Sequence, residues 1–170
     1  MNRIFLIGYM GSGKTTIGKL LAERLNYTFI DMDTHIEENQ FKSVSHIFEE
    51  LGEEKFRLLE QQCLHEVSGF ENVVIATGGG APCFFDNMDY MKQHGLTVYL
   101  KLSAEQLAMR LESSRANKRP LLANRKGKEL QVFISEGLAK REQFYNNAHI
   151  SAVGSDEEII DQIYQYIITQ

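Results

Sequence analysis

The sequence Gly8-Tyr9-Met10-Gly11-Ser12-Gly13-Lys14-Thr15 follows a short apolar run, Ile4–Ile7, and precedes apolar residues with helical spacing. It matches the pattern G-x-x-x-x-G-K-[ST] at every fixed position. Between a strand and a helix from about Lys14 to Leu25, the backbone N–H groups of such a loop can surround phosphate oxygens. The N-terminus of the helix adds the positive end of its dipole. A glycine-rich turn before a helix is the structural alternative, but the strand, loop and helix order favours a nucleotide-binding loop.

The loop predicts a set of contacts to ATP and to its magnesium ion. Lys14 is expected to neutralise the β and γ phosphates, the Thr15 hydroxyl to bind Mg²⁺, and Thr16 to reach the α phosphate. The predicted ATP-binding residues of this segment are Gly11, Ser12, Gly13, Lys14, Thr15 and Thr16. Tyr9 and Met10 occupy variable positions of the pattern and are expected to act as spacers.

The rest of the chain alternates short apolar runs with segments of helical spacing. The predicted strands are Ile4–Ile7, Thr28–Ile30, Val73–Ala76, Thr97–Leu102 and His149–Val153. Two predicted helices begin with capping-box spacing, Ser103 with Gln106 and Ser155 with Glu158. Strands that alternate with helices indicate right-handed crossovers and a parallel sheet. We therefore expect one three-layer α/β/α domain over residues 1–170, with a five-stranded parallel sheet.

Composition excludes several classes of protein. The 170 residues carry a net charge of −5, which argues against general affinity for nucleic acid or anionic membrane. No apolar run is long enough for a membrane helix, and the first residues lack the pattern of a signal peptide. Cys63 and Cys83 are too few for a disulfide framework and lack metal-binding spacing. A cytoplasmic location is expected.

Two acids follow the second predicted strand, Asp31 and Asp33. Ligands of open α/β sheets bind at the carboxyl ends of the strands. Alternation along an extended chain would send both side chains to the same side. One acid can then hold Mg²⁺ through water while the other accepts a proton from a substrate hydroxyl. In the structural alternative, Asp33 or Thr34 caps the next helix.

The loop alone does not separate kinases from GTPases. A GTPase would carry an Asn-Lys-x-Asp segment and an Asp-x-x-Gly segment, and the sequence contains neither. A small-molecule kinase is therefore favoured. The alternatives from other classes are a nucleotide-dependent switch that binds a protein partner and a catalytically silent nucleotide-binding module.

Four further segments resemble those of shikimate kinases, in the same order and over nearly the whole chain. They are Gly52-Glu53-Glu54-Lys55-Phe56-Arg57-Leu58-Leu59-Glu60, which looks like G-E-x-x-F-R-x-x-E; Thr77-Gly78-Gly79-Gly80; Arg119-Pro120-Leu121-Leu122; and Arg141 followed by Tyr145. The resemblance implies the sheet order 2-3-1-4-5 and transfer of the ATP γ-phosphate to the 3-hydroxyl of shikimate. It also implies a monomer that binds ATP and shikimate. Gluconate kinase and nucleoside monophosphate kinase are the related alternatives.

The resemblance also implies roles for individual residues. Arg57 and Arg141 would bind the substrate carboxylate, because planar guanidinium groups form bidentate bonds to carboxylates. Asp33 would hold the ring hydroxyls and orient, or deprotonate, the attacking one. The predicted substrate-binding residues are Asp33, Arg57, Gly78, Gly79, Gly80 and Arg141, and the predicted catalytic residues are Lys14, Asp33 and Arg119. The predicted metal ligands are Thr15 and, through water, Asp31.

Two regions are expected to surround these residues: a substrate-binding helical region at about 32–62 and a lid at about 113–128. Arg119 would reach the triphosphate from the lid. Arg110 and Arg115 are both candidates for the contact with adenine. Glu60 is expected either to hold Arg57, which lies three residues earlier on the same helix face, or to be a solvated acid.

Overall fold

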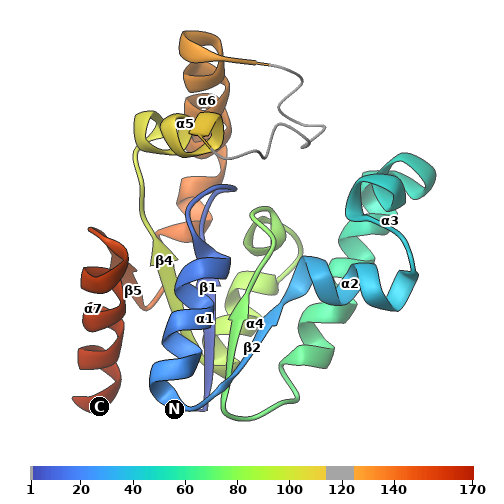
Figure 1. The fold of residues 1–170 in the computed structure, drawn as a ribbon. Helices are drawn as coiled ribbons and strands as arrows, with labels where there is room; N and C mark the ends of the chain where they lie inside the picture. The colour runs from blue at the N-terminus through green and yellow to red at the C-terminus, as the bar shows by residue number, and fades with distance from the viewer. Residues whose placement is uncertain (1, 114–124) are drawn as a thin grey trace.

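The computed structural model describes residues 2–113 and 125–170, and its five strands form one parallel sheet in the order β2-β3-β1-β4-β5 (Figure 1). The strands are β1 (Arg3–Ile7), β2 (Thr28–Asp31), β3 (Val73–Ala76), β4 (Leu96–Leu100) and β5 (Ile150–Ala152). The predicted strands and their predicted order are confirmed.

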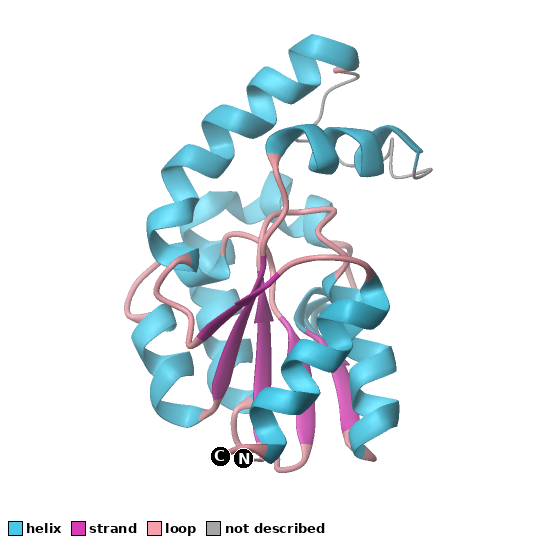
Figure 2. Cartoon of the chain, turned by 90° about the vertical axis from the view of Figure 1, so that its left-hand side faces the viewer, coloured by secondary structure: helices cyan, strands magenta, loops and turns pink. Residues whose placement is uncertain are grey.

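Helices cover both faces of the sheet (Figure 2). They are α1 (Lys14–Leu25), α2 (Met32–Gln40), α3 (Val44–Val67), α4 (Asn87–His94), α5 (Ala104–Ser113), α6 (Gly127–Tyr145) and α7 (Asp156–Ile168), with a short 3₁₀ helix, η1 (Ala81–Cys83). Two hydrophobic cores lie between the layers. The core with α1 and α7 contains Ile4 and Leu6 of β1, whereas Phe5 and Ile7 belong to the core on the other face. Successive side chains of a strand point to opposite faces, so β1 contributes to both cores.

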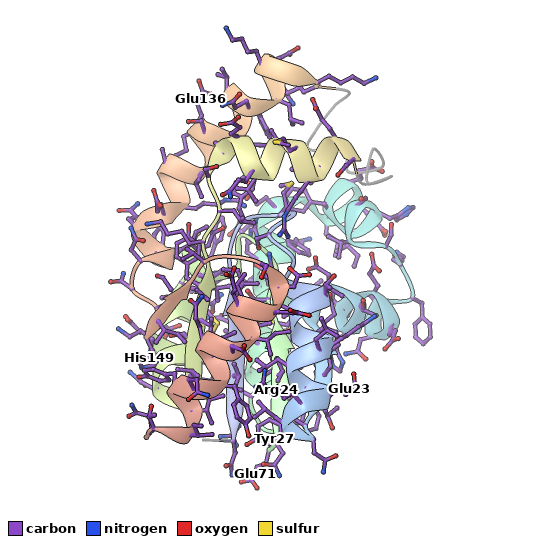
Figure 3. The ribbon with its side chains drawn as sticks, turned by 60° about the vertical axis from the view of Figure 1, so that its left-hand side comes forward. Glu23, Arg24, Tyr27, Glu71, Glu136 and His149 are labelled. Atoms are coloured by element: carbon purple, nitrogen blue, oxygen red, sulfur yellow. The ribbon has the colours of Figure 1, made fainter. Side chains whose placement is uncertain are left out.

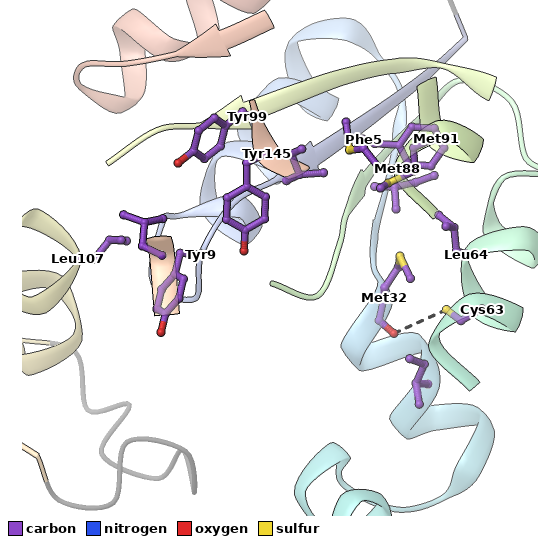
Figure 4. Close-up of a cluster of buried hydrophobic side chains, with 14 of the residues drawn as sticks. Phe5, Tyr9, Met32, Cys63, Leu64, Met88, Met91, Tyr99, Leu107 and Tyr145 are labelled. Atoms are coloured by element: carbon purple, nitrogen blue, oxygen red, sulfur yellow. Dashed lines mark hydrogen bonds between the residues drawn. The ribbon is translucent and has the colours of Figure 1, made fainter. Parts of the chain in front are cut away.

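The core that contains Phe5 and Ile7 is the larger of the two and extends from α2 and α3 to α6 (Figure 4). Tyr9, Tyr99 and Tyr145 are all buried in it. Tyr9 belongs to the phosphate-binding loop, so the loop is anchored in the core by an aromatic side chain. The expectation that Tyr9 is a spacer is therefore wrong.

The helix ends follow the sequence signals. Ser155 and Glu158 form the predicted capping box, and Ser103 and Gln106 exchange the corresponding pair of hydrogen bonds. On the outer surface, Arg24 of α1, which is labelled in Figure 3, forms an ion pair with Asp161 of α7. Exposed ion pairs contribute little to the stability of the folded state, whereas burial of apolar side chains in the two cores contributes most of it.

The segment after β2 differs from the prediction. Asp31 ends β2 and caps α2, because its side chain accepts hydrogen bonds from the backbone N–H groups of Asp33 and Thr34. Asp33 therefore lies in the first turn of a helix. The argument that strand alternation aligns the two acids is wrong, and the cap is Asp31 rather than Asp33 or Thr34.

Within the described ranges, no helix has the length and apolar character needed to cross a membrane. Residues 114–124 lie outside the described ranges, and with them most of the predicted lid, including Arg115 and Arg119.

Candidate active site

The phosphate-binding loop joins β1 to α1 in a conformation that requires glycine. Gly11 and Gly13 have φ values of 82° and 92°, in the left-handed region that favours glycine. Gly13 precedes the first residue of α1, and no side chain caps the helix there. The first N–H groups of α1 are therefore available to an anionic ligand.

Lys14 folds back across this loop. Its Nζ donates hydrogen bonds to the carbonyl oxygens of Gly8, at 2.8 Å, and of Tyr9, at 3.1 Å. Lys14 is also buried, with 9% of its surface exposed. The loop thus holds an ammonium group beside the N-terminus of α1, where both can neutralise phosphate charge.

Thr15 and Asp31 meet at the edge of the sheet. The Thr15 hydroxyl donates a hydrogen bond to Asp31 Oδ2 at 2.7 Å, while Asp31 Oδ1 caps α2. These hydroxyl and carboxylate oxygens are hard donors of the kind that Mg²⁺ prefers. The structure therefore brings together the two residues that were predicted to hold the metal, and their chemistry suits it. Thr16 follows on the exposed first turn of α1.

A cavity of about 310 Å³ opens beside the loop, and the predicted substrate-binding residues all line it. Its walls are formed by Met10, Asp33, Val44, Ser45, Phe48, Glu49, Phe56, Arg57, Glu60, Gly78, Gly79, Gly80 and Arg141. Met10 therefore faces this cavity and is not a spacer. Ser45 and Glu49 belong to no sequence motif, so sequence reasoning missed them. They reach the cavity because they lie in the first turns of the kinked helix α3.

The kink of α3 lies at Gly52, whose φ of 79° and ψ of 170° are not helical. After the kink, Arg57 and Glu60 point to the cavity from the second part of the helix. Arg57 Nη1 lies 2.8 Å from Glu60 Oε1, and Arg57 Nη2 lies 3.5 Å from Glu53 Oε1. Arg57 also lies over the ring of Phe84, 4.1 Å from its centroid. The guanidinium is thus held from several sides.

Glu60 is buried, with 1% of its surface exposed, so it is not a solvated acid. Burial raises the pKa of the Glu60 carboxyl above its ordinary value, and the Arg57 guanidinium opposes this shift. The alternative in which Glu60 holds Arg57 is confirmed.

The glycine segment after β3 passes so close to these side chains that larger residues do not fit. A Cβ atom at Gly80 would lie 2.6 Å from Arg57 Nη1, and one at Gly78 would lie 2.6 Å from Glu60 Oε2. The backbone of this segment therefore forms one wall of the cavity directly.

Arg141 reaches the cavity from α6. Its guanidinium lies over the ring of Tyr9, 5.4 Å from the centroid. Tyr145, one turn further along α6, donates a hydrogen bond from its hydroxyl to the carbonyl oxygen of Gly79 at 2.5 Å. Two arginines from different helices thus converge on a small cavity that also holds Asp33.

Arg110 lies on the other side of the phosphate-binding loop. Its Nη1 donates a hydrogen bond to the carbonyl oxygen of Ser12 at 3.4 Å, and its Nη2 lies 3.8 Å from Asp156 Oδ1. Arg110 is therefore next to the nucleotide-binding loop, whereas the other candidate for adenine, Arg115, lies outside the described residues.

Comparisons with known proteins agree with one another. A family model described as "Shikimate kinase" matches residues 10–170. A shikimate kinase from Parabacteroides distasonis is 56% identical over 151 residues, which cover 89% of this chain and 87% of the relative.

Solved structures give the same result. A shikimate kinase from Bacteroides thetaiotaomicron has a TM-score of 0.90 and 45% identity, and the match covers 99% of this chain and 98% of that one. A shikimate kinase from Acinetobacter baumannii in complex with shikimate has a TM-score of 0.88 and 34% identity, covering 99% and 94%. A gluconokinase from Sinorhizobium meliloti, at 14% identity and a TM-score of 0.56, shares the fold alone.

Proposed function

The chain belongs to the shikimate kinase family, and we propose that it transfers the γ-phosphate of ATP to the 3-hydroxyl of shikimate in the cavity beside Lys14. The products are shikimate 3-phosphate and ADP. The observation that carries the proposal is the convergence of Asp33, Arg57 and Arg141 on one cavity next to the phosphate-binding loop.

The two arginines would bind the carboxylate of shikimate. Arg57 comes from α3 and Arg141 from α6, so the carboxylate can lie between two planar guanidinium groups. Phe48 and Phe56, whose ring centroids are 5.2 Å apart, line the same cavity and offer an apolar surface to the carbon ring of the substrate. The backbone of Gly78, Gly79 and Gly80 would approach the substrate from β3.

Asp33 would bind the ring hydroxyls and orient the 3-hydroxyl for attack on the γ-phosphate. Phosphoryl transfer depends mainly on positioning and on stabilisation of charge. Lys14 would neutralise charge on the transferred group from within the loop, with Gly11, Ser12, Gly13, Thr15 and Thr16 around the phosphates. We propose that Arg119, from the lid at about 113–128, adds a second positive charge to the triphosphate.

A magnesium ion bound with ATP would be held by Thr15 and, through water, by Asp31. It would neutralise phosphate charge when bound. The oxygen donors of these two residues fit this ion, and a nucleotide-bound Mg²⁺ needs few protein ligands.

We further propose that residues 32–62 form the substrate-binding region, because α2 contributes Asp33 to the cavity and the two parts of α3 contribute Phe48 and Arg57. The enzyme would act on ATP and shikimate as a cytoplasmic monomer, without nucleic acid or membrane.

Release of ADP, measured with ATP, Mg²⁺ and one acceptor at a time, tests the proposed function. Shikimate should stimulate ADP release, whereas gluconate and AMP should not. Stimulation by gluconate instead of shikimate would keep the kinase assignment but overturn the substrate and the roles of Arg57 and Arg141.

A further inference from the structure

The two arginines of the cavity are held in different ways. Arg57 forms ion pairs with Glu60 and Glu53. For Arg141, residues 2–113 and 125–170 provide no carboxylate within ion-pair distance. Among the described residues, a contact other than an ion pair therefore orients the Arg141 guanidinium.

That contact comes from two tyrosines. Arg141 lies over the face of the Tyr9 ring, at 5.4 Å from the centroid. It also interacts with Tyr145, since its charge opposes the burial that raises the pKa of the Tyr145 hydroxyl. The Tyr145 hydroxyl donates a hydrogen bond to the carbonyl oxygen of Gly79 and interacts with the edge of the Arg141 guanidinium, whereas the Tyr9 ring supplies the flat surface beneath it.

The Tyr9 side chain is buried and packs against α6. The side chain is 3% exposed. A Cβ atom at Gly137 would lie 2.7 Å from Tyr9 Oη and 3.2 Å from Tyr9 Cε2, so the helix packs directly on the ring. Gly137 and Arg141 are four residues apart on α6 and therefore share one face of the helix. The ring of Tyr9 fits against this face, over Gly137 and under Arg141.

We propose that Tyr9 is a positioning residue for the substrate carboxylate: its ring, seated against Gly137, holds the Arg141 guanidinium toward the cavity. Tyr9 does not line the cavity, so it acts through Arg141 and not by touching the substrate. The proposal rests on the proposed function, because it assumes that Arg141 binds the carboxylate of shikimate. A cation over an aromatic face is favoured by the quadrupole of the ring, which an aliphatic side chain lacks.

The test compares Tyr9→Leu with Tyr9→Phe in the full chain. Tyr9→Leu removes the aromatic face but keeps a buried apolar side chain, and it should raise the KM and the Kd for shikimate roughly tenfold. Tyr9→Phe keeps the face and should restore most of the affinity. The KM for ATP should change much less than the KM for shikimate in both variants.

Phe5→Leu is the matched control. Phe5 is a buried aromatic residue of the same core, and Figure 4 shows it beside Met88 and Met91, away from Tyr9. The Phe5→Leu variant should have a lower melting temperature and an unchanged KM for shikimate. This result would separate a loss of core packing from a loss of Arg141 positioning.

Gly137→Ala tests the packing of the Tyr9 ring against α6. The added methyl group would lie closest to Tyr9 Oη, so the single variant should raise the KM for shikimate. The increase caused by Gly137→Ala should be smaller when it is combined with Tyr9→Phe, because phenylalanine lacks this oxygen.

Two results would overturn the inference: an unchanged Kd for shikimate in Tyr9→Leu, or an increase confined to the KM for ATP. Either result, with normal shikimate phosphorylation by the natural protein, leaves the proposed function intact. Absence of shikimate phosphorylation by the natural protein refutes the proposed function itself.

Discussion

Replacing Arg57 by alanine removes one partner of a buried ion pair, and we expect it to lower both shikimate affinity and the free energy of unfolding. Arg57 Nη1 lies 2.8 Å from Glu60 Oε1, and the two side chains are only 10% and 2% exposed. The variant leaves the Glu60 carboxylate buried without its counter-ion. Loss of one partner of such a pair costs about 3–5 kcal/mol of stability. Loss of charge-assisted bonds to the substrate should raise the KM for shikimate by roughly 10- to 100-fold.

The loss of stability should depend on pH. Burial already raises the pKa of Glu60 above 4.5, and without Arg57 it should rise further. A carboxyl whose pKa is higher in the folded state keeps a proton that the unfolded state has already lost. The free energy of unfolding therefore falls as pH rises through the window above the unfolded pKa. The free energy of unfolding of Arg57→Ala should therefore be closer to that of the natural protein at low pH than at neutral pH.

Urea denaturation followed by circular dichroism, at about pH 5 and about pH 8, measures this difference. The matched control is the double variant Arg57→Ala with Glu60→Gln, which removes the buried charge while keeping the shape of the side chain. It should be more stable than Arg57→Ala alone at the higher pH. Equal stability of the two variants there, or a loss that does not change with pH, would refute the reasoning.

Three further predictions concern the loop, the metal and a histidine. Lys14→Ala should abolish ADP release while the fold is retained, and substantial turnover of a folded variant would contradict the role of Lys14. Thr15→Val should raise the Mg²⁺ concentration needed for half-maximal rate, because it removes the hydroxyl that lies 2.7 Å from Asp31; an unchanged Mg²⁺ dependence would exclude Thr15 as a ligand. His149 Nδ1 accepts a hydrogen bond from the backbone N–H of Thr97, and burial lowers the pKa of His149. Its folded pKa lies below the unfolded one, so the natural protein should lose stability as pH falls below about 6.5, the ordinary value for histidine. Thermal unfolding should show a smaller loss in His149→Gln, and an equal loss in both proteins would argue against His149 as the cause.

Much of the fold follows from local patterns in the chain. The helix from Lys14 to Leu25 has the predicted bounds, because the glycine before it and the apolar spacing within it are both local signals. The motif residues Arg57 and Arg141 both line the cavity, and their binding of the substrate carboxylate stays a prediction.

Other features needed the packed structure. The capping of α2 by Asp31, and not by Asp33 or Thr34, depends on where β2 ends, a boundary that periodicity does not define to the residue. The burial of Glu60 depends on the kink at Gly52 and on the glycine segment after β3, which is distant in sequence. The residues next to Glu60 in the sequence predict neither the kink nor the approach of the glycine segment.

The amino-acid sequence alone was enough to predict the nucleotide-binding loop, the alternation of strands and helices, and the chemical types of the groups that we propose to act on phosphate and carboxylate. Those properties depend on residue identity and short spacing, which a linear chain displays directly. The packed structure was needed to show that Tyr9 lies under Arg141, that Glu60 is buried, and that Ser45 and Glu49 face the cavity. Burial and long-range contact arise when helices pack on a sheet, and the energy of a charge depends on the surroundings that this packing creates.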